Sequence, residues 1–200
     1  MTNKILVLSG LIALLVTPLT GEVETGKNAP DFTLTDTTGK EHSLSDFEGQ
    51  YVVLEWFNQD CPFVKKHYDS GNMQDLQKSM TDEDVVWLQV ISSAEGKQGY
   101  VTPSEGETLR EEKNMHSTAM LLDTEGKVGR AYDARVTPHM YLINPEGELV
   151  YQGAIDSISS SRKEDIDRAT NFVVEAYKAA KNGEKAPNPS TKAYGCSVKY

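Results

Sequence analysis

The two cysteines of this 200-residue chain, Cys61 and Cys196, are the residues whose chemistry is most readily predicted. Cys61 follows an apolar run typical of a strand and directly precedes Pro62, and proline is favoured at the first position of a helix. Cys61 is therefore expected at a helix N-terminus, where unpaired N–H groups and the helix dipole favour a thiolate over a thiol. The sequence thus indicates redox or thiol chemistry, with an inert buried thiol as the alternative.

A short apolar segment near the N-terminus indicates export. Lys4 precedes an apolar run over residues 5–16, which is shorter than the roughly 20 residues that a membrane-spanning helix needs. A cationic start and a short apolar core are typical of a secretory signal peptide, which we predict over residues 1–21. An uncleaved membrane anchor is the alternative. In either case the folded part is expected to be periplasmic or secreted, where disulfides are permitted.

Two cysteines in an exported chain can form one disulfide. Such a bond between Cys61 and Cys196 has two interpretations. It is either a structural link that fastens the C-terminus, or a catalytic pair in which Cys196 resolves a mixed disulfide at Cys61. The proline-containing segment 186–190 favours an extended, mobile tail, which we predict over residues 184–200.

The composition predicts one globular domain and excludes some classes of function. The chain is 25% charged and 38% hydrophobic, with a net charge of −10. No basic cluster exceeds Lys65-Lys66, so nucleic-acid binding is not expected. Metal-ligand spacings such as His-x-x-x-His are missing, and His67 is expected off the face of the helix that carries Cys61. Neither a metal nor another cofactor is predicted.

The elements expected around Cys61 alternate between strands and helices. Strands are predicted over residues 51–57, 85–91, 119–122, 140–143 and 148–152, after an N-terminal hairpin over residues 32–44. Helices are predicted over residues 62–80, with a break at residues 69–72 as the alternative, and over residues 102–115 and 162–181, with a further short helix capped by Asp123. This alternation predicts an α/β domain with a mixed sheet, which we place at residues 22–183. Ligands of such folds bind where a strand ends and a helix begins, as at Cys61.

Four motifs relate the chain to a known family. They are Ala-Pro-Asp-Phe-Thr-Leu at residues 29–34, Asn-Gln-Asp-Cys-Pro-Phe-Val at 58–64, Val-Thr-Pro-His-Met-Tyr-Leu-Ile at 136–143 and Gly-Cys-Ser-Val-Lys at 195–199. With these motifs the sequence resembles thioredoxin-fold redoxins, and within them the peroxiredoxin-like, thiol-specific-antioxidant (AhpC/TSA) branch. The resemblance implies a thioredoxin-like fold, with a central mixed sheet flanked by helices, an N-terminal hairpin extension and a C-terminal tail.

The resemblance also implies roles for residues near Cys61. Cys61 corresponds to the attacking cysteine of the thioredoxin Cys-x-x-Cys motif. Thr137-Pro138 corresponds to the cis-proline loop, which packs against that cysteine and leaves a backbone edge free for a substrate peptide. Glu55 corresponds to the buried acid below the active site, which takes a proton from the second thiol and whose pKa burial should raise. A strand residue that faces solvent is the alternative for Glu55.

Two further residues are candidates for contacts with substrate or with Cys61. His139, beside Pro138, would hydrogen-bond a substrate or tune the thiolate, and a loop residue on the surface is the alternative. Asn58 would position Cys61 or cap its helix. The chain also departs from the related families, because Val64 replaces the second cysteine of Cys-x-x-Cys. A dedicated peroxiredoxin is not expected, since Leu54 and Asn58 occupy the Pro and Thr positions of the motif Pro-x-x-x-Thr-x-x-Cys.

The sequence therefore predicts an exported thiol–disulfide oxidoreductase with Cys61 as nucleophile and Cys196 as a candidate resolving cysteine. Its expected partners are disulfides or thiols of proteins or small molecules, with a membrane only if the N-terminal segment is uncleaved. Two alternatives stay open. One is a one-cysteine peroxidase with antioxidant activity, in which peroxide oxidises Cys61 to a sulfenic acid. The other is a non-catalytic redoxin-fold binding module with a structural Cys61–Cys196 disulfide.

Overall fold

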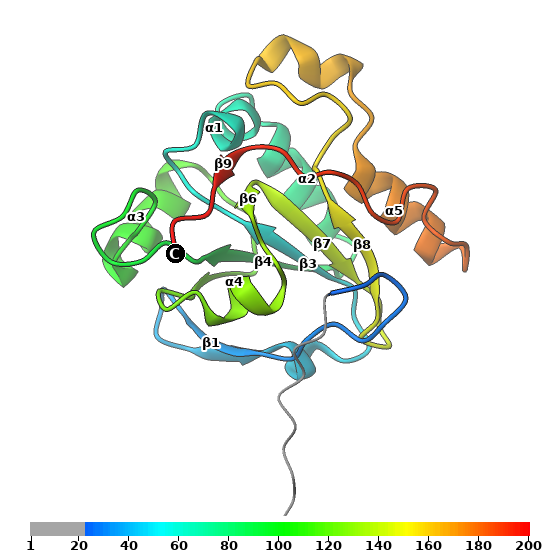
Figure 1. Cartoon of the computed structure of the whole chain (residues 1–200), viewed down its shortest axis with the longest axis horizontal. Helices are drawn as coiled ribbons and strands as arrows, with labels where there is room; N and C mark the ends of the chain where they lie inside the picture. Colours follow the sequence, from blue (N-terminus) through cyan, green and yellow to red (C-terminus); the bar gives the residue numbers. More distant parts are fainter. Residues whose placement is uncertain (1–22) are drawn as a thin grey trace, which may run out of the picture.

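The computed structural model describes residues 23–200, so the signal peptide predicted over residues 1–21 lies outside the described part of the chain. The described residues form a central sheet with helices against it (Figure 1). The strands are β1 (Thr33–Asp36), β2 (Glu41–Ser43), β3 (Val52–Trp56), β4 (Val86–Ile91), β5 (Ala119–Leu122), β6 (Val136–Thr137), β7 (His139–Ile143), β8 (Leu149–Gly153) and β9 (Cys196–Ser197). The helices are α1 (Pro62–Tyr68), α2 (Asn72–Thr81), α3 (Pro103–Glu112), α4 (Lys127–Ala131) and α5 (Phe172–Lys181), with 3₁₀ turns η1 (Leu44–Phe47) and η2 (Lys163–Arg168).

The main sheet has the strand order β2-β1-β5-β4-β3-β7-β8. Its central strand β3 runs parallel to β4 and antiparallel to β7, so the sheet is mixed, as predicted. Every residue of β3 and β4 is buried, because helices and loops cover both faces of these strands. The hairpin predicted near the N-terminus is confirmed as the antiparallel pair β1 and β2, at one edge of the sheet.

The two faces of the sheet carry separate parts of the core. Neighbouring residues of a strand point to opposite faces, so Val53 and Leu54 of β3 belong to different clusters. Val53 packs with residues of α1, α2 and α5, among them Met73 and Val173. Leu54 packs on the other face, where Tyr132 follows α4. Cys61 belongs to the first cluster, on the face that α1 covers.

Two long helices predicted from the sequence are shorter in the structure. The helix predicted over residues 62–80 is divided into α1 and α2, and Gly71, in the left-handed conformation at φ 81°, caps α2. The helix predicted over residues 162–181 is wrong in its first half, where a 3₁₀ turn replaces it. The α5 helix begins only after Asn171, whose side-chain oxygen accepts a hydrogen bond from Val174 N at 3.0 Å.

The short helix predicted after Asp123 is α4, and it begins later than the sequence suggested. Gly126 is its N-cap residue, yet the Asp123 side chain still provides hydrogen-bond acceptors for the first turn of α4. The Asp123 carboxylate accepts hydrogen bonds from the backbone N–H groups of Val128 and Gly129. Between residues 23 and 200, no helix combines the length and the apolar character that crossing a membrane requires.

The C-terminal segment packs across the domain and pairs with it. In Figure 1 it runs in red from α5 over the front of the sheet, and β9 pairs with β6 in a second, two-stranded sheet. The segment is extended, as predicted, and it is also held by backbone hydrogen bonds to β8 and to the loops around β6. These contacts join residues far apart in the chain, which is why local sequence patterns did not predict them.

Candidate active site

Cys61 lies where β3 leads into α1, as the sequence predicted. It is the N-cap residue of α1, and Pro62 occupies the first turn. The side chain has no exposed surface, and its sulfur lies 3.0 Å from the carbonyl oxygen of Thr137. Burial raises the pKa of the Cys61 thiol, but hydrogen bonds from the Cys196 side chain and the Val64 N–H outweigh burial, so the pKa lies below its ordinary value.

Cys196 lies next to Cys61, although the two are far apart in the chain. It sits in β9 directly opposite Thr137 of β6, and both cysteines are free thiols. Burial, the hydrogen bond to Cys61 and the charge of Cys61 raise the pKa of Cys196 to about 11. The pair is therefore asymmetric. Cys61 is the thiol that ionises first, and Cys196 remains a proton donor to it.

The loop between β6 and β7 forms the wall opposite Cys61. The peptide bond between Thr137 and Pro138 is cis, the isomer that the resemblance implied. The carbonyl of Thr137 accepts the hydrogen bond from the Cys61 thiol, and the same residue pairs with Cys196 of β9. This loop thus brings the two cysteines together.

Glu55 lies at the centre of β3 and is completely buried, so its interpretation as a solvent-facing residue is wrong. Its carboxylate accepts hydrogen bonds from Tyr68 Oη at 2.8 and 2.9 Å, from Trp87 Nε1 at 2.9 Å and from Gln77 Nε2 at 3.3 Å. Burial raises the pKa of Glu55 to about 7, even though these donors lower it. Glu55 makes no hydrogen bond to either cysteine within the described residues.

The residues that hold Glu55 were not predicted as site residues. Tyr68 Oη accepts hydrogen bonds from Gln77 at 2.9 Å and Gln89 at 2.7 Å while it donates to Glu55. Gln89 lies beside Glu55 on the neighbouring strand. A polar residue within the otherwise apolar strand over residues 86–91 was the one available signal. The result is a closed polar network beneath α1, inside an apolar core.

Asn58 shapes the turn before Cys61 and does not cap α1 with its side chain. Its side-chain oxygen accepts from Asp60 N at 2.9 Å, and its backbone carbonyl accepts from Cys61 N at 3.1 Å. A Cβ on Gly99 would lie 2.5 Å from the Asn58 side chain, so the loop around residue 99 packs closely against this turn. Asn58 therefore bonds to the backbone at Asp60 and Cys61.

His139 contacts residues on the face of the main sheet opposite the face that carries Cys61. It is the first residue of β7, half-buried, with Nδ1 3.1 Å from Tyr141 Oη, and Tyr141 packs in the cluster on the other face of the sheet. Burial lowers the pKa of His139 to about 4, so the ring is neutral at pH 7. The structure brings Asn58 and Thr137 into contact with Cys61, whereas neither Glu55 nor His139 makes a hydrogen bond to a thiol within residues 23–200.

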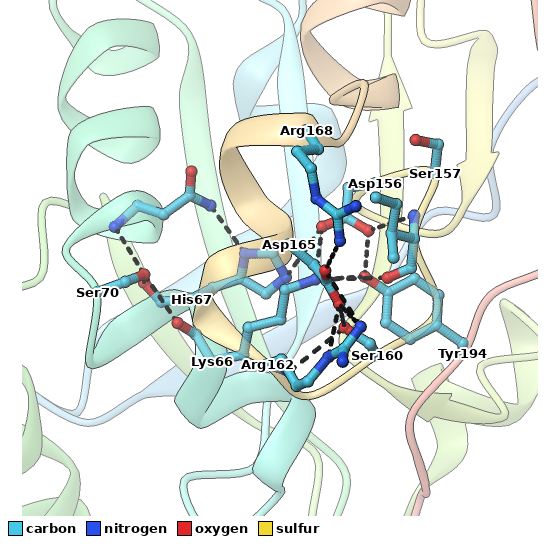
Figure 2. A network of polar contacts seen from close by, with 12 residues as sticks. Lys66, His67, Ser70, Asp156, Ser157, Ser160, Arg162, Asp165, Arg168 and Tyr194 are labelled. Carbon is cyan, nitrogen blue, oxygen red and sulfur yellow. Dashed lines mark hydrogen bonds and ion pairs between the residues drawn. The ribbon is translucent and has the colours of Figure 1, made fainter.

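A buried polar network fixes the segment that precedes Cys196 (Figure 2). Lys66 of α1 is buried, and its Nζ lies 2.8 Å from the Asp156 carboxylate. Tyr194, two residues before Cys196, donates its hydroxyl to the same carboxylate and accepts from Lys66 Nζ at 3.4 Å. His67 Nε2 is 3.7 Å from Asp156, and burial together with the charge of Lys66 lowers the pKa of His67 to about 4. Sequence analysis missed this network, because its members come from three distant segments.

Metal ligands are not gathered at this site. Within residues 23–200, no group of three or more His, Cys, Asp or Glu side chains is arranged to hold a metal ion. The polar groups around Cys61 are instead a second thiol, backbone amides and carbonyls. Their arrangement suits proton transfer and exchange between sulfur atoms.

Comparison with known proteins extends these observations. Residues 25–152 match the AhpC/TSA family model. The thiol–disulfide oxidoreductase ResA of Bacillus subtilis is 30% identical over 128 residues, which are 64% of this chain and 66% of ResA. An uncharacterized conserved protein from Geobacillus kaustophilus superposes with a TM-score of 0.77 at 26% identity, over 88% of this chain and 92% of that chain.

A second solved structure identifies the fold. The thioredoxin domain of a thiol–disulfide oxidoreductase from Bacteroides vulgatus has a TM-score of 0.53 at 21% identity, over 74% of this chain and 98% of that domain. The expected thioredoxin-like fold is thus confirmed. The family match includes Glu55, Cys61 and Pro138, but it ends at residue 152, so Asp156, Tyr194 and Cys196 all lie beyond it.

Proposed function

Since the chain belongs to the AhpC/TSA family, we propose that it is a thiol–disulfide oxidoreductase in which Cys61 attacks and Cys196 resolves. The observation that carries the proposal is the position of the two thiols, because β9 places Cys196 opposite Thr137, whose carbonyl oxygen lies 3.0 Å from the Cys61 sulfur. The pKa of Cys61 is lowered and that of Cys196 is raised, and the two side chains are hydrogen-bonded to each other. Exchange needs such a difference, because the attacking sulfur must be a thiolate while the second waits as a thiol.

The proposed exchange proceeds in two steps. The Cys61 thiolate attacks one sulfur of a substrate disulfide, the substrate S–S bond breaks, and a substrate thiolate leaves. Cys196 then loses its proton and attacks the Cys61 sulfur, which releases the second substrate thiol and leaves a Cys61–Cys196 disulfide. The substrate gains two electrons and two protons, and the dithiol of the chain loses the same number. In the opposite direction the same steps oxidise a substrate dithiol.

Glu55 is the proposed proton acceptor for Cys196. A carboxyl group with a pKa of about 7 exchanges protons readily at neutral pH. The transfer requires an intermediary, because Glu55 bonds to Tyr68, Trp87 and Gln77 rather than to a thiol. Tyr68, which donates to Glu55 from α1, is the proposed first member of that relay.

The backbone of β6 is the proposed site for a substrate peptide. A strand edge binds an extended peptide through main-chain hydrogen bonds, and in the described structure β9 pairs with the β6 edge that would do so. The edge of Val136–Thr137 is adjacent to Cys61, and the contact between Thr137 O and the Cys61 sulfur fixes their relative position. A protein or peptide disulfide presented in extended form is therefore the proposed substrate.

Single cysteine variants test this function. Purified Cys61→Ser and Cys196→Ser are incubated with a peptide disulfide, and adducts are located by mass spectrometry. We expect Cys196→Ser to accumulate a mixed disulfide at Cys61, and Cys61→Ser to form none. Unchanged turnover by Cys196→Ser would exclude the resolving role, and exchange by Cys61→Ser would exclude Cys61 as the nucleophile.

The reduction potential of the pair separates a catalytic from a structural disulfide. Thiol trapping in glutathione buffers, read by mass spectrometry, gives this potential directly. We expect a reduction potential of about −200 mV, which is typical of exchangeable pairs. A value below about −300 mV would identify a structural bond instead, and would favour the non-catalytic binding module.

Export is part of the proposal. The support is the cationic start and the apolar run over residues 5–16, which precede a domain with two cysteines placed to react. Fractionation of cells that express the full chain tests this directly. Recovery of the protein from the cytoplasm with residues 1–21 still attached would contradict it.

A further inference from the structure

Residues 192–200, which we name the C-terminal strap, cover the candidate active site. In an antiparallel pair, Cys196 lies opposite Thr137 and Ser197 opposite Val136. Val198 N continues the pairing with a 3.0 Å hydrogen bond to Arg135 O. The strap backbone therefore occupies the β6 edge that the proposed function assigns to a substrate, and Cys61 beneath it has no exposed surface.

The strap is fastened on the side before Cys196 by Tyr194. The Tyr194 ring contacts Phe63 at a centroid distance of 5.7 Å, and its hydroxyl donates to Asp156 (Figure 2). Lys66, which belongs to α1, donates a hydrogen bond to the same hydroxyl. These contacts are largely polar and the Tyr194 side chain is only half-buried, so the strap is attached without belonging to the buried core.

On the other side of Cys196, the strap is fastened by Tyr200. Its ring lies 4.5 Å from the Arg130 guanidinium, and its hydroxyl donates to Ala134 O at 2.6 Å. Ala94 N donates to Lys199 O at 2.9 Å. Tyr200 is itself exposed. The strap thus makes few attachments, an exposed one at Tyr200 and a half-buried one at Tyr194, and these can break while the core remains folded.

The base of the strap is held separately at Thr191. Thr191 N donates to Gln152 O at 3.0 Å, and its side-chain oxygen accepts from Ala154 N at 3.0 Å. Lys192 and Ala193 follow without any hydrogen bond in the described structure. The strap can therefore turn at these two residues while Thr191 stays on β8, so Cys196 is not carried far from the site.

Gly195 permits the close approach between the strap and β6. A Cβ at this position would lie 1.9 Å from the Thr137 carbonyl oxygen, and φ is 147°, which side chains rarely adopt. No side chain fits here while the strap is docked. A single methyl group should therefore displace the strap without touching the core.

We propose that the strap and a substrate peptide occupy the β6 edge in turn. The strap lifts to admit substrate to Cys61, and its return displaces the substrate backbone and delivers Cys196. During the return the Cys196 thiolate attacks the Cys61 sulfur, the Cys61–substrate bond breaks, and the substrate leaves as a thiolate that takes a proton from water. Resolution and release become a single event. This proposal rests on the proposed function and describes how that same site is regulated.

Gly195→Ala in the full chain tests the proposal with two readouts. The first is the rate at which iodoacetamide alkylates Cys61 in the reduced protein, located by mass spectrometry. We expect it to rise about tenfold or more, because reactivity follows the population of the open form. The second is the mixed disulfide with a peptide disulfide, which should form faster than in the wild type and persist, because Cys196 no longer docks.

Two other variants serve as controls. Ser197→Ala removes an exposed hydroxyl from β9 and leaves the backbone pairing intact, so both readouts should match those of the wild type. Cys196→Ser keeps the strap docked, so its mixed disulfide should accumulate without the rise in Cys61 alkylation seen in Gly195→Ala. Equal alkylation of Cys61 in the wild type and Gly195→Ala would overturn the proposal.

The two readouts distinguish failure of the strap from failure of the proposed function. Faster alkylation without a mixed disulfide in any variant would refute exchange and leave the strap intact as a cover. A mixed disulfide in Cys196→Ser with unchanged alkylation in Gly195→Ala would refute the strap alone. If Gly195→Ala does not fold, the proposal is tested by the rates of amide hydrogen exchange in the wild-type protein. The Val198 amide should exchange at least about 100-fold faster than the β3 amides, and equal rates would overturn the proposal.

Discussion

At the scale of single residues, Cys61 works with a partner that is remote in sequence. In a Cys-x-x-Cys motif the second thiol lies one helical turn away, and here Val64 occupies that position. The neighbouring thiol is instead supplied by β9. The identity of the attacking cysteine could be predicted from Pro62 and the preceding strand. The position of Cys196 could not be predicted, because it depends on the pairing of β9 with β6, two strands that are far apart in the sequence.

Restoring the local motif should make the distant thiol dispensable. Val64 is buried one turn after Cys61, and cysteine fits the space of valine. We expect Cys196→Ser to lower turnover by at least about tenfold, since the mixed disulfide is no longer resolved. Adding Val64→Cys should recover most of this loss in a peptide-disulfide assay. Val64→Ala in the Cys196→Ser background is the control, and recovery there would show that the thiol is not the cause.

Glu55 should make the stability of the protein depend on pH. Its ordinary pKa is 4.5 and its pKa in the folded chain is about 7. Between these values the unfolded chain has lost a proton that the folded chain keeps, so the contribution of Glu55 to the free energy of unfolding falls as the pH rises from 4.5 to about 7, while the lowered pKa values of His67 and His139 act in the opposite direction. The fall amounts to about 3 kcal/mol, since one pKa unit corresponds to about 1.4 kcal/mol. Urea unfolding at several pH values measures it.

Glu55→Gln should remove most of this pH dependence, because the amide does not ionise. The exchange rate of Glu55→Gln should also lose any inflection near pH 7 if Glu55 accepts the proton of Cys196. Glu112→Gln, which changes an exposed carboxyl of α3, is the matched control and should retain the pH dependence. Wild type and Glu55→Gln profiles that run parallel between pH 4.5 and 7 would contradict the shifted pKa of Glu55.

At the scale of elements, α1 connects Cys61 to the strap. Its N-terminus carries Cys61, and its next turns carry Lys66 and Tyr68, which reach Asp156 and Glu55 respectively. The sequence predicted the start of this helix correctly from Pro62. It also indicated residues 69–72 as the place of a break, and the break between α1 and α2 lies there, at Gly71.

Breaking the ion pair between α1 and the loop after β8 should strongly destabilise the chain. Asp156→Asn leaves Lys66 buried without a full counter-charge, and we expect a loss of about 3–5 kcal/mol in the free energy of unfolding. The double variant Lys66→Met/Asp156→Asn should regain most of that loss, because no buried charge is left unpaired. Urea unfolding of the three proteins tests this. A double variant no more stable than Asp156→Asn would show that the charge is not the cause.

The elements were predicted unevenly. The central strands were recognisable because strands buried on both faces are continuously apolar, as β3 and β4 are. The helix predicted over residues 162–181 was too long, because helical spacing in its first half coincides with a polar network around Asp165 that favours a 3₁₀ turn. The β9 strand has only two residues, too few for any pattern to indicate it.

At the scale of the whole molecule, the segment that covers the active site lies outside the family match. The AhpC/TSA match spans residues 25–152, whereas the strap and Asp156 follow it. The fold class followed from the alternation of strands and helices together with four motifs. The cover over the active site did not, since nothing in the composition of residues 184–200 identifies where they dock.

Oxidation should stabilise the whole chain. A Cys61–Cys196 bond closes a loop of well over 100 residues, and the entropy lost by the unfolded chain corresponds to about 4–5 kcal/mol. Because β9 already holds Cys196 beside Cys61, we expect most of this gain to be realised. Urea unfolding of the oxidised and reduced forms, without and with reductant, measures it. Equal stability of the two forms would show that the bond strains the native fold.

The complete burial of Cys61 has a kinetic consequence. A reagent that must wait for a cover to open cannot react faster than the cover opens, however concentrated the reagent is. The nucleophile of this protein is therefore insulated from the many small oxidants and stray thiols that collide with its surface. The rate at which the cover opens therefore sets an upper limit on the rate of reaction at Cys61. Raising the reagent concentration until the reaction rate stops increasing would measure this opening rate directly.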